Sequence, residues 1–344
     1  MLSKGIHNSP MPSRKRKQKS PIGEFFYGLR YRIGEYALRA FVAALPWIPY
    51  RLLVLFTEFW AWVTFGFLWK YRRRMEENVS MALGKSLKDA RDRKSLVWRA
   101  WKNFARGILE TSAVMHLSKE KIISRVVLEG EQHLKSALAK GQGVLALSAH
   151  LGSFTMIGAR LAAAGYLFSA VVKQPRDERF AGLIDGYRAE IGIETISAKP
   201  RTEAVRGILK ALRANRIVLM IADEFKSGDV MVDFMGRSSA APRGPATLAL
   251  RTGAVTLPMF ATRRPDGSLV LSIGAEVKPV QLEDLEESVR ATTALYTRHL
   301  ENAIRDYPDQ WNWLGFPRDG RISRLGRRKA HREGALPPRR RVAR

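Results

Sequence analysis

Residues 144–156 read VLALSAHLGSFTM, and they carry the clearest indication of the fold. Val144–Ser148 is short, apolar almost throughout and bounded by glycine on its amino side, which is typical of a buried strand. Residues 154–164 have the length and composition of a helix, and Gly165 ends it. A buried strand, a tight turn and a helix in this order predict one βα unit of an α/β sheet.

The same alternation extends in both directions from this unit. Further strands are expected at 126–128, 167–172, 194–196, 217–222, 256–262 and 268–273. Further helices are expected at 131–140, 180–191, 203–213 and 289–307. Strands and helices that alternate at these lengths predict an α/β fold with a mostly parallel central sheet flanked by helices, over residues 119–316.

A helical region, 23–118, precedes the sheet and contains an apolar, aromatic-rich stretch at 52–69. That stretch is about long enough to span a bilayer. Glu58 lies inside it, Pro49 stops a helix just before it, and basic residues flank both sides. The pattern favours an interfacial or re-entrant helix pair at a membrane surface, with a single span or a buried core helix as the alternatives.

The chain of 344 residues has a net charge of +27, and about half of this excess lies at its two ends. Residues 1–20 contribute +6 and residues 324–344 contribute +8, so 1–22 and 317–344 are expected to be disordered basic tails. Such charge favours anionic partners, either membrane lipid or an acidic protein. Nucleic acid is the weaker alternative because no binding motif accompanies the charge.

The chain contains no cysteine, which excludes disulfides, thiolate metal sites and a thiol nucleophile. Its chemistry therefore has to come from other side chains. The sharpest candidate is His150, in the turn directly after the strand that ends at Ser148. Active sites of open α/β sheets gather at the carboxyl ends of strands, and a neutral imidazole there can act as a general base. We expect His150 to be exposed in a cleft; a capping or packing residue is the alternative.

Residues 150–155, HLGSFT, resemble the first motif of the glycerolipid and lipid A acyltransferases, which reads His, four residues, then Asp or Glu. In the lipid A late-acyltransferase branch the motif often reads HLGNFE, so Ser153 replaces the Asn and Thr155 occupies the acid position. Other segments resemble that branch in its own order: MEENVSMALG (75–84), KQPRDERFAGLIDGYRAEIG (173–192), IVLMIADEF (217–225), VDFMGRSSAAPRGPATLALRTGA (232–254) and AIRDYPDQWNWL (303–314).

The resemblance implies acyl transfer from an acyl thioester to a hydroxyl group. The donor would be acyl-carrier protein or acyl-CoA, and the acceptor a lipid A precursor or a related anionic glycolipid or phospholipid. His150 would take the hydroxyl proton, and no metal or bound cofactor is implied. The family's setting would place the chain at the cytoplasmic face of a bacterial inner membrane, with anionic lipid and an acidic acyl-carrier protein as partners.

Thr155 breaks the family pattern. Its hydroxyl accepts a hydrogen bond but cannot neutralise an imidazolium ion. No carboxylate lies between Glu131 and Asp177, so Asp223 and Glu224, at another strand end, are the candidates to replace the acid. The alternative is a catalytically impaired family member that acts as a lipid-binding or membrane-assembly protein.

Four cations are candidate phosphate-binding residues of the substrate site: Lys173, Arg176, Arg188 and Arg243. Lys173 and Arg176 follow a predicted strand end and lie in the segment that resembles the family's second basic block. The alternative for each of the four is a solvated surface charge.

Overall fold

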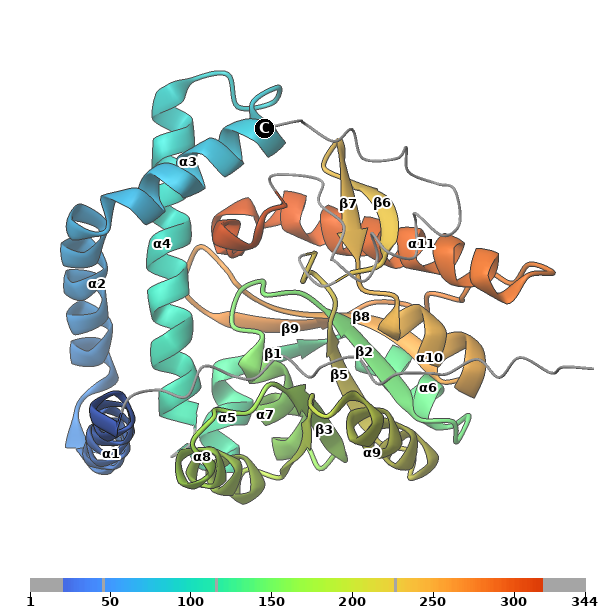
Figure 1. Ribbon diagram of the computed structural model, residues 1–344, viewed down its shortest axis with the longest axis horizontal. Coiled ribbons are helices and arrows are strands. Elements are labelled where there is room, and N and C mark those ends of the chain that lie inside the picture. The colour runs from blue at the N-terminus through green and yellow to red at the C-terminus, as the bar shows by residue number, and fades with distance from the viewer. Residues whose placement is uncertain (1–20, 45–46, 115–116, 226–227, 318–344) are drawn as a thin grey trace, which may run out of the picture.

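A seven-stranded sheet forms the centre of the computed structural model, which describes residues 21–317 except 45–46, 115–116 and 226–227 (Figure 1). From one edge to the other its strands are β1 (Val126–Glu129), β9 (Leu269–Ile273), β8 (Val255–Arg263), β2 (Val144–Ser148), β5 (Ile217–Ile221), β3 (Phe168–Val172) and β4 (Ile193–Ser197). All neighbouring strands are parallel except β8 and β9. The mostly parallel α/β sheet predicted from the sequence is confirmed.

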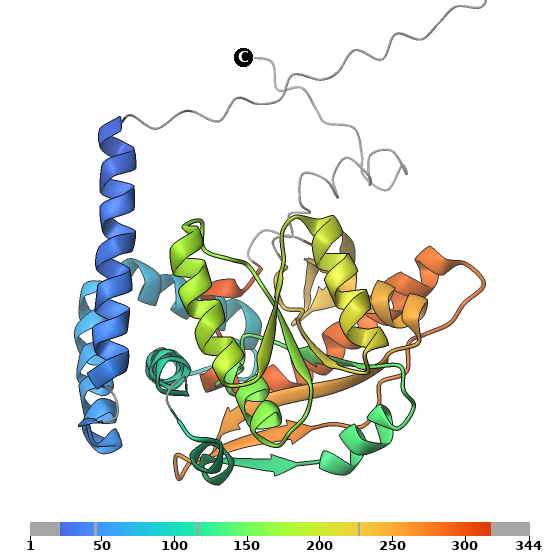
Figure 2. The ribbon, with the colours of Figure 1, turned by 90° about the horizontal axis from the view of Figure 1, so that it is seen from below.

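Helices cover both faces of this sheet (Figure 2). They are α5 (Lys119–Arg125), α6 (Glu131–Leu138), α7 (Thr155–Ala163), α8 (Glu178–Glu190), α9 (Arg201–Arg213), α10 (Gly244–Thr252) and α11 (Leu285–Asp306). In β2, Leu145 and Leu147 belong to the core packed against α9, α10 and α11, whereas Val144 and Ala146 belong to the core packed against α6 and α7. Because successive strand side chains point to opposite faces, a strand buried on both faces must be apolar throughout.

Four helices pack at one side of the sheet. They are α1 (Pro21–Ala44), α2 (Tyr50–Phe67), α3 (Trp69–Leu83) and α4 (Ala90–Ala113). The second of them, α2, runs along α4 (Figure 1). Within the described residues, no single helix has both the length and the apolar composition to cross a bilayer, whereas α2 and α3, bent at 88°, pass that test together on length and composition alone.

The antiparallel hairpin of β6 (Val230–Phe234) and β7 (Arg237–Ala241) was not predicted from the sequence, and neither was the short helix α10 that follows it. Met235 and Gly236 form the turn between the two strands, and both have positive φ. The strand β7 reads RSSAA, and four of its five residues are small Ser or Ala, so no strand pattern marks it. The predicted basic tails, 1–22 and 317–344, lie almost entirely outside the described residues.

Candidate active site

The strand register brings His150 and Asp223 together. The strands β2 and β5 are parallel neighbours, and their register pairs Ser148 with Ile221. The backbone N–H of Ala222 donates to the Ser148 carbonyl at 2.9 Å, which continues the ladder past the end of β5. The second residue after each member of this pair therefore lies at the same point of the sheet's carboxyl edge. These residues are His150, which follows Ser148, and Asp223, which follows Ile221.

Asp223 is the carboxylate that binds the His150 ring. The distance between His150 Nδ1 and Asp223 Oδ1 is 2.8 Å. The other carboxylate oxygen, Oδ2, accepts the backbone N–H of His150 and the indole N–H of Trp311, each at 2.9 Å. The Asp223 side chain is only 3% exposed, and three donors fix its orientation. An ionised carboxylate can only accept, so Nδ1 carries the proton and Nε2 keeps the free lone pair.

The same contacts set the basicity of His150. Partial burial of the ring lowers its pKa, but the hydrogen bond to Asp223 and the negative charge of that carboxylate outweigh burial. Glu224, which is itself exposed, adds a smaller charge effect in the same direction. The net result is a pKa of His150 above its ordinary value, so this imidazole is a stronger base than a free histidine.

His150 lies in a cavity of about 300 Å³ at the carboxyl edge of the sheet. Its side chain is 34% exposed, and the edge of its ring faces the Phe154 ring at 5.1 Å between centroids. The expectation of a histidine in a cleft at a strand's carboxyl end is confirmed.

Thr155 is the first residue of α7 and lines the same cavity. Its hydroxyl lies 2.8 Å from the hydroxyl of Thr111 on α4, so the contact it makes is with α4 and not with the imidazole. The structure thus gives the imidazole a carboxylate partner from the segment directly after β5 in place of one from α7. Of the two candidates at that strand end, Asp223 makes the contact and Glu224 does not.

A buried ion pair holds the turn that carries His150. Glu110 of α4 accepts hydrogen bonds from the Ser153 hydroxyl and from the guanidinium of Arg263, at the end of β8. The backbone N–H of Gly152 donates to the Gln310 carbonyl at 2.8 Å. Glu110 was not predicted as a site residue, because no local sequence pattern links α4 to the turn.

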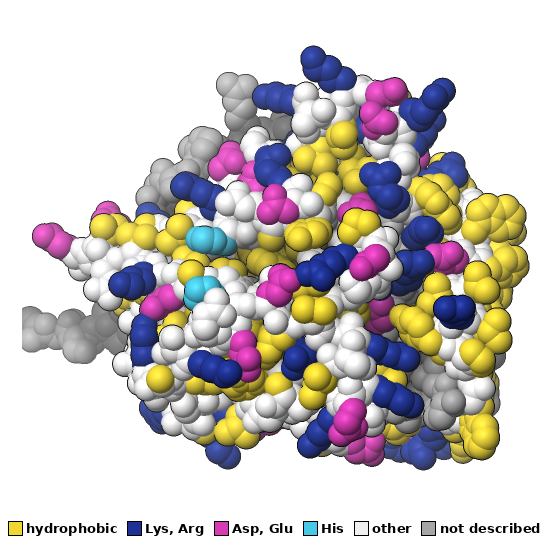
Figure 3. All heavy atoms as spheres, turned by 180° about the vertical axis from the view of Figure 1, so that it is seen from behind, with side chains coloured by type: hydrophobic (Ala, Val, Ile, Leu, Met, Phe, Trp, Pro, Cys, Tyr) yellow, Lys and Arg dark blue, Asp and Glu magenta, His cyan; other side chains and the backbone are white. Residues whose placement is uncertain are grey.

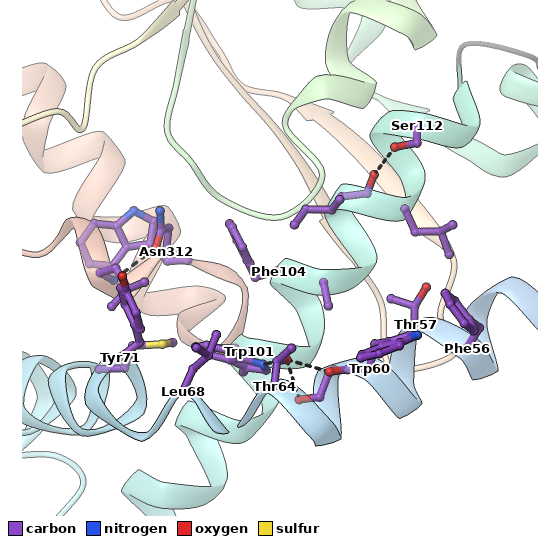
Figure 4. Close-up of a pocket in the computed structure, with 18 of the residues that line it drawn as sticks. Phe56, Thr57, Trp60, Thr64, Leu68, Tyr71, Trp101, Phe104, Ser112 and Asn312 are labelled. Carbon is purple, nitrogen blue, oxygen red and sulfur yellow. Dashed lines mark hydrogen bonds between the residues drawn. The ribbon is translucent and has the colours of Figure 1, made fainter. Parts of the chain in front are cut away.

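An apolar groove of about 520 Å³ adjoins the His150 cavity and runs between α2 and α4 (Figure 4). The groove and the cavity share the lining residues Phe104, Ile108, Ser112, Trp311 and Asn312. Three of the hydroxyls in the groove are already satisfied: Thr57, Thr64 and Ser112 each donate to the backbone carbonyl four residues earlier, at 2.7, 2.7 and 3.0 Å. The groove therefore presents hydrocarbon and aromatic surface, which suits an apolar chain better than a polar ligand.

The four predicted phosphate-binding cations are dispersed. Lys173 and Arg176 are exposed in the loop after β3, at the same edge as His150 but across β5 from it. Arg188 lies in the last turn of α8, at the opposite edge, because this helix runs back between two parallel strands. Arg243 precedes α10 and pairs with Glu286 at 2.7 Å, lining a different groove. Only Lys173 and Arg176 share the edge and the surface exposure that a headgroup site needs.

Among the described residues, no group of three or more His, Asp or Glu side chains is placed to hold a metal ion.

Comparison with known proteins adds to this geometry. Residues 26–315 match the family described as bacterial lipid A biosynthesis acyltransferase. A phosphatidylinositol mannoside acyltransferase of Mycolicibacterium smegmatis is 26% identical over 293 residues, which cover 80% of this chain and 93% of that protein. Its counterpart in Mycobacterium tuberculosis is 30% identical over 215 residues, 61% of this chain and 65% of that protein. The lipid A biosynthesis lauroyltransferase of Escherichia coli is 24% identical over 229 residues, 65% and 71% of the two chains.

Proposed function

The chain belongs to the bacterial lipid A biosynthesis acyltransferase family, and on that premise we propose that it moves a fatty acyl group from an acyl thioester to a hydroxyl of an anionic glycolipid, with His150 as the general base. The observation that carries this proposal is the 2.8 Å contact between His150 Nδ1 and Asp223 Oδ1. It leaves Nε2 as the proton acceptor beside an apolar groove.

The reaction requires one proton acceptor and one group that stabilises its cation. The acceptor hydroxyl gives its proton to Nε2 of His150 while its oxygen attacks the thioester carbonyl. The tetrahedral intermediate then expels the thiolate, which takes the proton back from the imidazolium. Asp223 stabilises the imidazolium during this interval and keeps the ring in the required tautomer. Proton transfer of this kind contributes about 10²–10⁴-fold to a rate.

The groove between α2 and α4 is the proposed site for the acyl chain. Its α4 wall runs from Ala100 to Ser112, about 18 Å at 1.5 Å per residue. Ser112 and Ile108 line both the groove and the His150 cavity, so a chain lying in the groove has its carbonyl end at the imidazole.

The outer face of α2 is the proposed membrane contact, at the cytoplasmic face of a bacterial inner membrane. Phe59, Trp62 and Phe67 point away from the groove, and Trp62 and Phe67 are 66% and 81% exposed. Figure 3 shows hydrophobic side chains gathered at the edge of the molecule that α2 forms. Aromatic side chains favour the headgroup region of a bilayer, where the acceptor lipid resides. Lys173 and Arg176 are the proposed cations for its phosphate, because both are exposed at the carboxyl edge.

Thr155 favours a second candidate, a lipid-binding protein on the same fold that does not catalyse transfer. The His150–Asp223 contact favours the enzyme, because a binding protein has no need of a buried carboxylate on the imidazole.

An acyl-transfer assay with the purified full-length chain separates the two. Labelled acyl-CoA and acyl-carrier protein serve as donors, with a phosphatidylinositol mannoside and a lipid A precursor as acceptors, and mass spectrometry detects the product. We expect transfer by the wild type and a loss of at least about 10² in rate in His150→Ala. Both proteins should still bind a fluorescent fatty acid. Binding by both proteins without transfer by either would identify the lipid-binding protein instead.

A further inference from the structure

A second groove, of about 1080 Å³, lies between α9 and α10 on the face of the sheet opposite α7. These two helices lie at the far side of the molecule from α2 (Figure 1). Its lining includes the arginines Arg201, Arg213, Arg243 and Arg251, against the carboxylates Asp229 and Glu286. Neither the His150 cavity nor the acyl groove shares a lining residue with it.

The α9–α10 groove combines an apolar wall with unpaired cations at both ends. Val205, 39% exposed, and Leu248 contribute to the apolar wall. Arg201, Arg213 and Arg251 are exposed, and in the part of the chain that the structure describes none of them has an ion-pair partner. Arg201 and Arg213 stand at the two ends of α9, about 18 Å apart at 1.5 Å per residue. An apolar strip with cations at either end complements an amphipathic helix that carries acidic side chains.

One lining residue of the α9–α10 groove lies close in the chain to the candidate active site. Met220 of β5 lines it and precedes Asp223 by three residues. At a rise of about 3.3 Å per residue along a strand, the two backbones are about 10 Å apart. A protein docked in the groove can therefore hold a flexible thioester arm within reach of His150. Because the groove lies away from α2, such a protein does not compete with a membrane for that helix.

We propose that the α9–α10 groove docks an acidic helix of the carrier protein that delivers the acyl thioester. This inference rests on the proposed function and adds the place at which the donor binds. The arginines supply charge complementarity and speed association, and the apolar wall holds the helix once it has docked.

A charge-reversal variant tests the groove. In the triple variant Arg201→Glu, Arg213→Glu, Arg251→Glu, we expect the KM for acyl-carrier protein to rise at least about tenfold, because three attractive contacts become repulsive. The KM for acyl-pantetheine, an uncharged small donor, should stay unchanged. Arg206→Glu is the matched control, since Arg206 is exposed on the same helix but does not line the groove.

Direct binding keeps the test independent of turnover. Anisotropy of a labelled acyl-carrier protein should show binding to the wild type and to Arg206→Glu, and at least about tenfold weaker binding to the triple variant. Equal affinity of all three proteins, or no binding of carrier to the wild type, overturns the docking site. Transfer from acyl-pantetheine with no effect of the triple variant on carrier also overturns it while leaving the proposed function intact. Carrier binding that depends on the arginines without any acyl transfer supports the groove and counts against the function.

Discussion

The imidazole of His150 owes its chemical character to residues that lie far from it in the sequence. Asp223 fixes the tautomer and raises the pKa, and Trp311 holds the carboxylate from the other side. A histidine placed in a turn by its own strand would lack both effects. One buried carboxylate oxygen, Oδ1 of Asp223, therefore distinguishes a histidine that can act as a base from one that only packs.

Thr155→Glu restores the acid that the family motif places at this position. We expect kcat/KM to stay close to that of the wild type, because Nδ1 of His150 is already hydrogen-bonded to Asp223. The side chain at position 155 contacts Thr111 instead of the imidazole. Steady-state kinetics of Thr155→Glu and of Thr155→Ser, as the control, measure this. A gain in kcat/KM of about tenfold, which corresponds to a barrier lower by about 1.4 kcal/mol, would mean that residue 155 contacts the imidazole and that Asp223 does not stabilise it.

Glu110→Ala removes one partner of a buried ion pair. We expect the free energy of unfolding to fall by about 3–5 kcal/mol, because the guanidinium of Arg263 is left buried without its partner. Glu129→Ala is the control: its pair with Arg264, at 2.5 Å, is about half exposed, and its loss should cost less than about 1 kcal/mol. Urea unfolding of both variants gives the comparison. Equal losses would show that burial does not distinguish the two pairs.

At the level of single residues, the sequence identified His150 because a strand pattern runs into its turn. It narrowed the acid to Asp223 and Glu224 but did not decide between them. The direction of a side chain just past a strand end depends on the register with the neighbouring strand, which no local pattern records. Glu110 was missed for a similar reason: its partners, Ser153 and Arg263, are separated from it by long stretches of chain.

At the level of elements, strands with an apolar run were predictable to within a residue or so. The expected strand at 144–148 is observed without change, and 217–222 differs by one residue. These runs are apolar because both of their faces are buried. The hairpin β6–β7 could not be predicted, because its second strand consists mostly of small residues and is stabilised by its partner strand. The groove between α2 and α4 was not predictable in detail, because helical spacing shows that residues share a face but not which helix covers it.

Ala105→Phe narrows that groove. Ala105 lines it from α4, and a phenyl ring there would take up space that the proposed acyl chain occupies. We expect kcat/KM to fall more for long acyl donors than for short ones, by about tenfold or more at the longest chain, since lost chain contacts cost about 0.8 kcal/mol per methylene. Ala189→Phe, at an exposed position of α8, is the control. A uniform fall across all chain lengths would place the acyl chain elsewhere.

The two proposed contact surfaces lie in different parts of the molecule. In Figure 1, α2, which carries exposed aromatic residues, lies at one side, and α9 and α10, whose residues line the arginine-rich groove, lie away from it. The net charge of +27 adds a general attraction to anionic surfaces. The net charge follows directly from the composition, whereas the apolar residues that remain exposed to solvent are known only once the helices are packed.

Removing the aromatic face of α2 tests the membrane contact. For Phe59→Ser, Trp62→Ser, Phe67→Ser in one chain, we expect binding to vesicles of anionic phospholipid to fall by about a hundredfold, at roughly 1 kcal/mol per ring. The residual binding should disappear at high salt, because charge alone then holds the chain. The control substitutes three exposed leucines away from α2 by serine: Leu167, Leu282 and Leu285. Equal vesicle binding by the two triple variants would remove α2 from the membrane contact.

The pH dependence of kcat/KM in the wild type and in Asp223→Asn tests the pairing of His150 with Asp223 most directly. A general base must be neutral, so activity rises as pH passes the pKa of His150 in the free enzyme. Asp223 holds that pKa above its ordinary value, about 6.5, and burial alone would lower it. We expect the acid limb of the wild type to lie above that value, the limb of Asp223→Asn to lie at lower pH, and kcat/KM of Asp223→Asn to fall by up to about 10⁴. An unchanged limb with unchanged kcat/KM in Asp223→Asn would contradict it.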